Sequence, residues 1–332
     1  MRTGLRELLA CPACRGELSW RIDERNADHI EEGEGRCAAC GATYPVREGI
    51  GLLLTPDLPR EDLWEETGSG LSEYLRKHPE VERALLETPL GELSPADQFF
   101  RALLLEERGD FAGAREAEAA ATAGLYTREY RDCWRRQVDH VRARLAEAKG
   151  TVVDLASGRG YLAEGLARVP DLHLVLTDFS PRVLRRNRRY FEFLGLYGKV
   201  SLIVCDARRL PFRDGAIATM TTNLGLPNIR EPGTLLSELR RALSGTFYAI
   251  CHFFPPGDEE NRAAIRELGL ETFLYETPAL ESFVRAGFRV EVKNVCRGRA
   301  LPTPESRLIP GARIDALPVA GTELTWCTLV AG

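Results

Sequence analysis

The spacing of apolar residues changes twice along the 332-residue chain and divides it into three segments. From about residue 150 onward, short continuous apolar runs, such as 151–154 and 172–178, alternate with longer stretches of mixed polarity. Runs of this length predict buried strands, and their alternation with helical stretches predicts an α/β fold. We expect units at residues 1–58, 59–149 and 150–332.

Helical spacing dominates the middle segment, which follows a linker marked by Pro56 and Pro59. Apolar residues then recur three and four positions apart, and Ser94 followed by Pro95 is typical of a helix start. The single helix–Gly-Asp–helix run near residue 109 is similar to half of a tetratricopeptide repeat. One copy cannot build a solenoid, so we expect a helical hairpin.

The last helix of this segment carries an aromatic stripe. Tyr126, Tyr130 and Trp134 lie four positions apart, on one face of the predicted helix. The simplest interpretation is a stripe that packs into the core. Because this helix directly precedes the strand at 151–154, the alternative is that one of these rings covers a bound cofactor.

Composition indicates a soluble globular protein. The net charge is −5 and 44% of the residues are hydrophobic. No apolar run approaches the roughly 18 to 20 residues that cross a bilayer, and the first 30 residues resemble no signal peptide. The negative charge argues against a surface that is basic throughout, although residues 150–250 are basic on balance. We expect a cytoplasmic protein with no membrane partner; the oligomeric state is left open.

Cysteine usage points to a reducing compartment and a metal. Nine cysteines is an odd number, and four of them form two C-x-x-C pairs, Cys11/Cys14 and Cys37/Cys40, with 22 residues between the pairs. Two such pairs can close a tetrahedron around Zn²⁺, with a structural role because four thiolates leave no open position. The alternatives are an iron–sulfur cluster or two redox C-x-x-C motifs. The redox interpretation lacks the strand-and-helix frame of a thioredoxin. The remaining five cysteines need no disulfide.

The residues after the second pair are more specific. Gly41 to Ile50 contains Tyr44-Pro45 and Gly49-Ile50, and a Leu-rich stretch follows. Together with the two pairs, this pattern resembles the zinc-ribbon activator subunit of tRNA and protein methyltransferases. The resemblance covers about residues 5–55 and implies one structural zinc ion.

Residues 151–163 read as a strand, a Gly-rich turn and the start of a helix. Asp154 ends the strand, and small residues at 156, 158 and 160 let the backbone approach a ligand closely. An acid at this place would repel a dinucleotide phosphate and suits a cationic ligand. The next strand ends in Asp178, 18 residues beyond Gly160, where a carboxylate can accept hydrogen bonds from ribose hydroxyls. The third strand also runs into an acid, Asp206.

From about residue 126 the chain resembles the class I S-adenosylmethionine-dependent methyltransferases, in particular the "type 11" group. The resemblance implies a Rossmann-like, seven-stranded methyltransferase fold closed by an antiparallel hairpin. It also implies S-adenosylmethionine as cofactor. The residues it places at the cofactor are Asp154, Ala156, Ser157, Gly158, Gly160, Asp178, Phe179, Ser180, Cys205, Asp206, Ala207, Asn223 and Leu224. The chain departs from the family at Ala156, where a glycine is usual, and at Ser244-Gly245-Thr246.

The implied chemistry is in-line displacement on the sulfonium methyl group, for which positioning alone can supply about 7–11 kcal/mol. Such a reaction needs no strong base. His252, at the end of the predicted fifth strand, is the best candidate for a general base, and a purely structural histidine is the alternative. The Asn-Pro-Pro-Tyr motif of exocyclic-amine methyltransferases is absent, since Leu-Gly-Leu follows Asn223.

We expect a small-molecule acceptor, with the middle helices and the Pro-rich loop at 301–318 as a lid. One alternative is an rRNA or tRNA methyltransferase that uses the ribbon for RNA contact. Its support is an arginine stripe on the helix after Asp178, which we expect more readily to pair with the acidic middle segment: Arg182, Arg185, Arg186 and Arg189. The sequence also leaves open a protein acceptor, or a cofactor-binding module that docks a partner and has no activity of its own.

Overall fold

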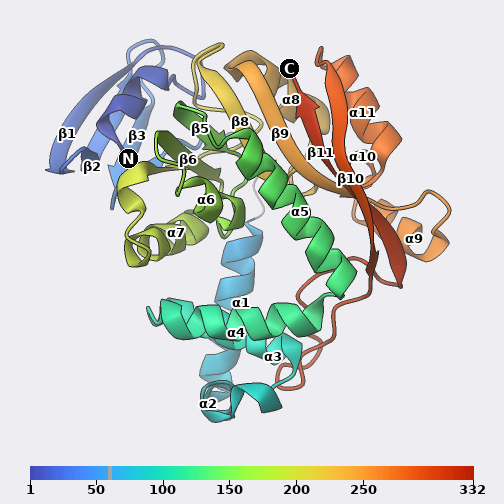
Figure 1. Ribbon diagram of the computed structural model, residues 1–332. Helices are drawn as coiled ribbons and strands as arrows, with labels where there is room; N and C mark the ends of the chain where they lie inside the picture. The colour runs from blue at the N-terminus through green and yellow to red at the C-terminus, as the bar shows by residue number, and fades with distance from the viewer. Residues whose placement is uncertain (59–61) are drawn as a thin grey trace.

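The computed structural model describes residues 1–58 and 62–332, and one sheet of eleven strands runs through it (Figure 1). The strand order is β1-β2-β3-β4-β7-β6-β5-β8-β9-β11-β10. The first four strands are β1 (Leu18–Asn26), β2 (His29–Cys37), β3 (Thr43–Arg47) and β4 (Ile50–Leu52). The others are β5 (Gly150–Asp154), β6 (Leu172–Asp178), β7 (Val200–Val204), β8 (Ile217–Asn223), β9 (Leu243–Phe253), β10 (Val290–Ala300) and β11 (Thr322–Ala331).

The seven strands after residue 149 form the expected Rossmann-like unit. Strands β5 to β9 are parallel to one another, and β11 runs antiparallel between β9 and β10. The chain moves outward from β5 in one direction through β6 and β7, and in the other through β8 and β9. This reversal is a topological switch point, where open α/β sheets bind ligands at the carboxyl ends of their strands. The predicted fold class is confirmed.

Helices cover both faces of this unit. The helices after residue 127 are α5 (Arg128–Arg144), α6 (Tyr161–Leu166), α7 (Pro181–Phe193), α8 (Pro232–Ala242), α9 (Glu259–Glu267), α10 (Glu271–Leu274) and α11 (Glu276–Arg285). One core packs side chains of α5, α6 and α7 against one face of the sheet, and the other packs α8 and α11 against the opposite face. Helix α5 therefore lies on the sheet although the sequence grouped it with the middle segment.

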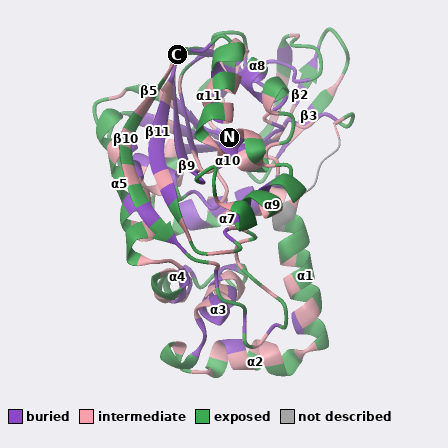
Figure 2. Cartoon of the chain, turned by 90° about the vertical axis from the view of Figure 1, so that its right-hand side faces the viewer, coloured by how far each residue is buried: buried purple, intermediate pink, exposed green. Residues whose placement is uncertain are grey.

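The remaining helices gather at one end of the sheet, as both views show (Figures 1 and 2). They are α1 (Leu63–Lys77), α2 (Pro79–Glu87), α3 (Pro95–Glu107) and α4 (Phe111–Leu125), and we call α1–α4 the helical insert. Helices α3 and α4 form the predicted hairpin, and Ser94 caps α3 with Pro95 at its first position. The predicted linker residue Pro59 lies outside the described residues.

The loop at 301–318 packs on the helical insert. The carboxylate of Asp97 accepts hydrogen bonds from the hydroxyl of Ser306 and from the backbone N–H groups of Arg307 and Leu308, the last two at 3.2 Å. Ile309 joins Leu75, Leu85 and Phe100 in a small separate core. The loop and the insert therefore pack together as one unit, and their role as a lid stays a prediction.

The ribbon extends the catalytic sheet, which the sequence did not predict. Strand β4 pairs in parallel with β7, with Ile50 opposite Leu202 and Leu52 opposite Val204, and the N–H of Leu53 donates to the carbonyl of Val204 at 2.8 Å. Seven strands therefore become eleven. The two units also share a core, because Leu9 of the ribbon packs with Phe212 of the catalytic unit. Among the described residues, no helix has the length and apolarity to span a membrane.

The shared core predicts a stability effect. Phe212 is fully buried, so Phe212→Ala should lower the free energy of unfolding by about 3–5 kcal/mol, measured by urea denaturation. Phe193→Ala is the control. Because Phe193 is 49% exposed, this substitution should lower the free energy of unfolding by less than about 1 kcal/mol. Equal losses in the two variants would contradict the role assigned to Phe212.

Candidate active site and zinc centre

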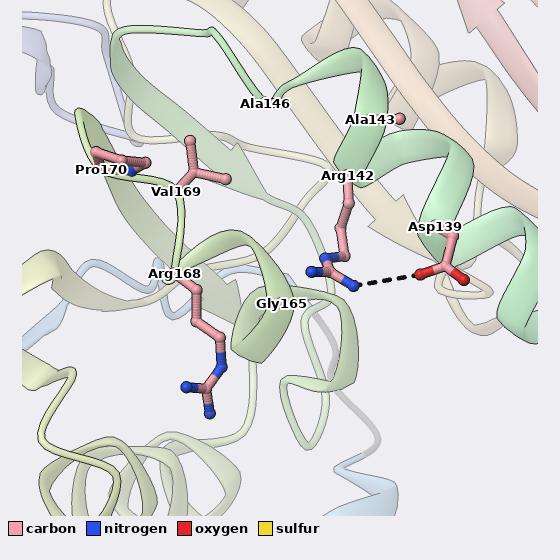
Figure 3. Close-up of a pocket in the computed structure, with 8 residues that line it drawn as sticks. All are labelled: Asp139, Arg142, Ala143, Ala146, Gly165, Arg168, Val169 and Pro170. Carbon is pink, nitrogen blue, oxygen red and sulfur yellow. Dashed lines mark hydrogen bonds and ion pairs between the residues drawn. The ribbon is translucent and has the colours of Figure 1, made fainter.

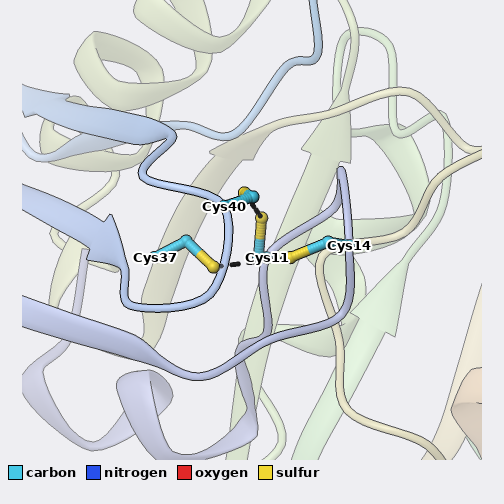
Figure 4. A group of neighbouring side chains, drawn as sticks. All are labelled: Cys11, Cys14, Cys37 and Cys40. Atoms are coloured by element: carbon cyan, nitrogen blue, oxygen red, sulfur yellow. Dashed lines mark hydrogen bonds between the residues drawn. The ribbon is translucent and has the colours of Figure 1, made fainter.

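Four cysteine sulfurs converge at the tip of the ribbon (Figure 4). All four Sγ atoms lie within 4.8 Å of one another, with Cys11 to Cys40 at 3.7 Å and Cys14 to Cys37 at 3.4 Å. In a tetrahedron with Zn–S bonds of about 2.3 Å the sulfurs stand roughly 3.8 Å apart. The donor set and its spacing therefore fit one structural zinc ion, as the sequence predicted.

Matching turns aim these sulfurs. The N–H of Arg15 donates to the carbonyl of Cys11 at 2.7 Å, and the N–H of Gly41 donates to that of Cys37 at 3.0 Å. A Cβ on Gly16 would stand 3.0 Å from the Cys37 sulfur and 3.2 Å from the Cys14 sulfur, so only glycine fits there without displacing a ligand. The buried hydroxyl of Tyr44 lies 3.2 Å from the Cys11 sulfur and can donate to a thiolate, which gives the predicted Tyr-Pro motif a structural role.

Zinc content tests this centre. Elemental analysis should find one zinc per chain, and Cys37→Ser should lower that content and the unfolding temperature, since metal binding contributes to folding. Cys296→Ser, outside the ribbon, should leave the zinc content unchanged. A fully folded protein with no zinc would refute the assignment.

The Gly-rich turn follows β5, leads into α6 and lies beside the carboxyl end of β6. Its backbone takes left-handed conformations at Ala156 (φ 48°), Gly158 (φ 48°) and Gly160 (φ 77°). The N–H of Ser157 donates to the carbonyl of Thr177 at 2.9 Å, which ties the turn to β6. The hydroxyl of Ser157 is buried and has no hydrogen-bond partner among the described residues, so it is available to a ligand.

Asp178 closes this turn from the end of β6. Its two carboxylate oxygens accept the N–H groups of Gly158 and Ser180, each at 3.0 Å. Burial raises the pKa of Asp178 to about 6, although these hydrogen bonds act in the opposite direction. Each oxygen has two lone pairs, so both can still accept a ribose hydroxyl. Together with Ser157 and the small residues of the turn, Asp178 fits the ribose part of S-adenosylmethionine.

Asp154 faces the neighbouring strand. Its carboxyl accepts the hydroxyl of Thr221 on β8 at 2.7 Å, and burial raises its pKa to about 7. Ser180 has an equally local contact, because its hydroxyl accepts the N–H of Val183 at 3.5 Å and caps α7. The roles of Asp154, Ser180 and Phe179 at the cofactor stay predictions.

The residues after β7 and β8 lie at the same edge. Cys205 is buried, and its N–H donates to the carbonyl of Asp178 at 2.9 Å, which fixes the start of the 205–207 segment beside Asp178. Asp206 forms an ion pair of 2.7 Å with Arg208, a partner that the sequence did not indicate. At the end of β8, the side-chain oxygen of Asn223 accepts the indole N–H of Trp134 at 3.2 Å. Contacts of Cys205, Asp206, Ala207, Asn223 and Leu224 with the cofactor stay predictions.

In β9, Ile250 pairs with Asn223, the last residue of β8, and His252 follows two residues later. Its ring packs among Trp326 (5.0 Å between ring centroids), Phe254 (5.9 Å) and Tyr130 (6.4 Å). Burial lowers its pKa to about 4, so the imidazole is neutral near pH 7 and a weak base. Its Nδ1 has no hydrogen-bond partner among the described residues. The general-base role stays a prediction. The apolar ring cluster supports the alternative, a purely structural histidine.

Two of the three predicted stripe residues, Tyr130 and Trp134, lie on α5, and the cofactor-covering alternative stays a prediction. Tyr130 packs edge-on against Trp326 in the core, with ring centroids 4.9 Å apart. Trp134 instead reaches Asn223 at the edge of the sheet. The prediction of one helix carrying all three rings is wrong for Tyr126, because the chain is extended there between α4 and α5. Its ring nevertheless stacks on Tyr130, and its hydroxyl donates to Asp315 of the 301–318 loop at 2.8 Å.

Three of the four arginines in the predicted stripe of α7 contact the acidic helical insert, and the fourth, Arg185, is exposed. Arg182 lies 2.6 Å from the Glu107 carboxylate, Arg186 forms an ion pair with Glu106, and Arg189 donates to the carbonyl of Glu107 at 3.4 Å. This agrees with the interpretation preferred from the sequence. These guanidinium groups face the insert and are not a free surface for phosphates.

A hollow of about 440 Å³ lies away from this edge (Figure 3). It is bordered by α5 and by the end of α6, and Arg142 pairs there with Asp139 at 3.2 Å. Val169 and Pro170 belong to the segment that enters β6 at its amino end, opposite the Gly-rich turn. The hollow is therefore distinct from the candidate cofactor site.

Two segments of the chain match known families. Residues 152–245 match the methyltransferase domain family, and residues 4–49 match the Trm112p-like protein family. The chain is therefore similar to a Trm112p-like zinc ribbon in its first part and to a methyltransferase domain in its second. The methyltransferase match spans the Gly-rich turn, Asp178, Asp206 and Asn223, but it ends before His252 and excludes the helical insert.

Relatives with assigned names align with the same domain. The demethylmenaquinone methyltransferase of Thermus thermophilus is 37% identical over 124 residues, which are 37% of this chain and 54% of that protein. A ubiquinone/menaquinone biosynthesis C-methyltransferase of Cupriavidus metallidurans is 35% identical over 94 residues, 28% of this chain and 38% of that protein. The chain thus spans about half or less of the length of these curated relatives.

A crystal structure of a candidate methyltransferase from Bacillus halodurans is also similar. It is 19% identical, covers 58% of this chain and 96% of its own, and has a TM-score of 0.46.

Cofactor affinity tests the role of Asp178. Asp178→Ala should abolish most S-adenosylmethionine binding in calorimetry, whereas Asp171→Ala should not, because Asp171 is exposed at the opposite end of β6. In the wild type, affinity should fall as the pH drops through about 6, since the protonated carboxyl loses acceptor capacity. Unchanged affinity in Asp178→Ala would refute the ribose assignment.

Proposed function

We propose that the protein is a methyltransferase that transfers the methyl group of S-adenosylmethionine to a small-molecule acceptor. The observation that carries this proposal is the Gly-rich turn closed by Asp178 at the topological switch point of the sheet. The match of residues 152–245 to the methyltransferase domain family supports it. The turn, the free hydroxyl of Ser157 and the carboxylate of Asp178 would hold the cofactor.

The reaction would be a single displacement. When bound, the cofactor supplies an activated methyl group on a sulfonium centre. The acceptor nucleophile forms a bond to this methyl group as the sulfur–carbon bond breaks, S-adenosylhomocysteine leaves, and the acceptor loses a proton. The chain's own contribution is to orient the acceptor and to exclude water, for which the insert and the 301–318 loop are placed at the carboxyl ends of the strands.

Two observations favour a small molecule over RNA. Three arginines of the α7 stripe are paired with the insert, so the feature that supported RNA binding has another role. The relatives are named for the methylation of quinone precursors, and we extend this substrate class to the present chain as part of the proposal.

A two-acceptor assay tests this function. The purified protein with S-adenosylmethionine should form S-adenosylhomocysteine in the presence of a short-chain demethylmenaquinol, and none above background with bulk tRNA. Asp178→Ala should be inactive and Asp171→Ala active. Methyl transfer to tRNA, or binding of cofactor without transfer to the quinol, would contradict the proposed acceptor class. Failure to bind the cofactor would contradict the function itself.

A further inference from the structure

An arginine occupies the centre of the Gly-rich turn. Arg159 stands between Gly158 and Gly160, and its side chain is 2% exposed. Its guanidinium points toward the helical insert, where it lies over the ring of Phe99 at 5.3 Å, and it also lies over the ring of Tyr161 at the start of α6 at 5.7 Å. A buried guanidinium cannot lose its proton in a protein, so it requires counter-charges at short distance.

The counter-charges come from two helices of the insert. Glu106 of α3 lies 2.7 Å from Arg159, and Glu118 of α4 lies 3.0 Å from it. Burial acts to raise the pKa of Glu106, but Arg159 and Arg186 outweigh that effect and hold the pKa below its usual value. The carboxylate is therefore ionised at neutral pH and neutralises positive charge at the turn.

The backbone of the turn is tied to the same cluster. The carbonyl of Arg159 accepts a hydrogen bond from Arg186 at 2.8 Å, and Arg186 also pairs with Glu106. The carbonyl of Gly158 accepts the side-chain amide of Asn187 at 2.7 Å. The position of the insert and the conformation of the Gly-rich turn are thus linked through four charged side chains: Arg159, Arg186, Glu106 and Glu118.

The cofactor and its product differ in charge, so the net charge of this cluster affects their binding differently. S-adenosylmethionine carries a sulfonium, an ammonium and a carboxylate group, with a net charge of +1. S-adenosylhomocysteine keeps the last two groups but has a neutral thioether. An uncompensated arginine in the turn would repel the sulfonium compound more than the thioether, because the two differ by this one charge.

We propose that the helical insert completes the cofactor site electrostatically: Glu106 and Glu118 balance the charges of Arg159 and Arg186, so that the docked insert favours the sulfonium cofactor over its neutral product. This inference rests on the proposed function, because it assumes that the cofactor binds at the Gly-rich turn. Glu106 and Glu118 are positioning residues, since they act through Arg159 and not by contact with the cofactor.

The ratio of two affinities tests this proposal. Calorimetry on the full-length, zinc-loaded protein gives the dissociation constants of S-adenosylmethionine and S-adenosylhomocysteine for each variant. Glu106→Gln should weaken the sulfonium ligand about tenfold more than the thioether. That is the scale of repulsion between unit charges roughly 10 Å apart at an effective dielectric constant of about 20, reduced by some screening. Adding Arg159→Met to this variant should restore the wild-type ratio.

A matched variant and a second acid complete the design. Glu82→Gln removes a glutamate that pairs with Arg108 inside the insert and should leave the ratio unchanged. Glu118→Gln should shift the ratio in the same direction as Glu106→Gln, and it provides the test if the more buried Glu106 proves necessary for folding. Thermal unfolding of each variant separates a loss of stability from a change in the ratio, since a purely structural effect weakens both ligands equally.

Three outcomes would overturn the inference. Equal weakening of both ligands in Glu106→Gln and Glu118→Gln would mean that the acids serve only to hold the fold. Tighter binding of both ligands would mean that Arg159 receives their common carboxylate once the glutamates release it. Failure of the Arg159→Met rescue would mean that the charge of Arg159 is not the cause. If the wild type binds neither ligand, the proposed function fails instead, so the two failures are distinguishable.

Discussion

The parallel pairing of β4 with β7 is the constraint on which the arrangement depends. Strand β7 would otherwise be the edge of the catalytic sheet, with a row of unpaired backbone groups. The paired strand belongs to a ribbon that is too small to fold on its own apolar core and is held by four thiolates around zinc. The metal therefore supports β4, β4 covers β7, and the segment that leaves β7 carries Cys205 and Asp206 to the cofactor edge. The zinc-binding ribbon and the candidate cofactor edge thus belong to one continuous sheet.

The opposite side of the site depends on charge rather than on strand pairing. The insert and the 301–318 loop share a small core and the buried carboxylate of Asp97, so they behave as one body. This body meets the catalytic domain through ion pairs to α7 and to the Gly-rich turn, and through Phe111 of α4, which packs in the core beside Tyr190 of α7.

Local patterns in the sequence were sufficient for the zinc ligands and for the acids at the strand ends. The spacing of Cys11, Cys14, Cys37 and Cys40 has one geometric solution, and apolar runs that stop at Asp154 and Asp178 bring both residues to one edge of a parallel sheet. Contacts between distant segments were beyond such patterns. Ile50 and Leu202 pair although about 150 residues separate them, and neither apolar run contains a signal that identifies the other as its partner. The environment of His252 was equally hidden, because Trp326 reaches it from the last strand.

The distribution of charge at the site has a common logic. Asp154 and Asp178 are buried at the ends of β5 and β6, and burial raises the pKa of each toward neutrality, which means that their ionised forms are destabilised in the free protein. A cationic ligand would favour those ionised forms and recover part of that free energy on binding. An unpaired Arg159 would stabilise the ionised aspartates even without a ligand. The cationic ligand would then gain less by binding, and the preference for it over the neutral product would be weaker. Because Glu106 and Glu118 balance the charges of Arg159 and Arg186, the negative potential of the two aspartates remains available to the ligand. The acids of the sheet and the acids of the insert would thus contribute to the same selectivity.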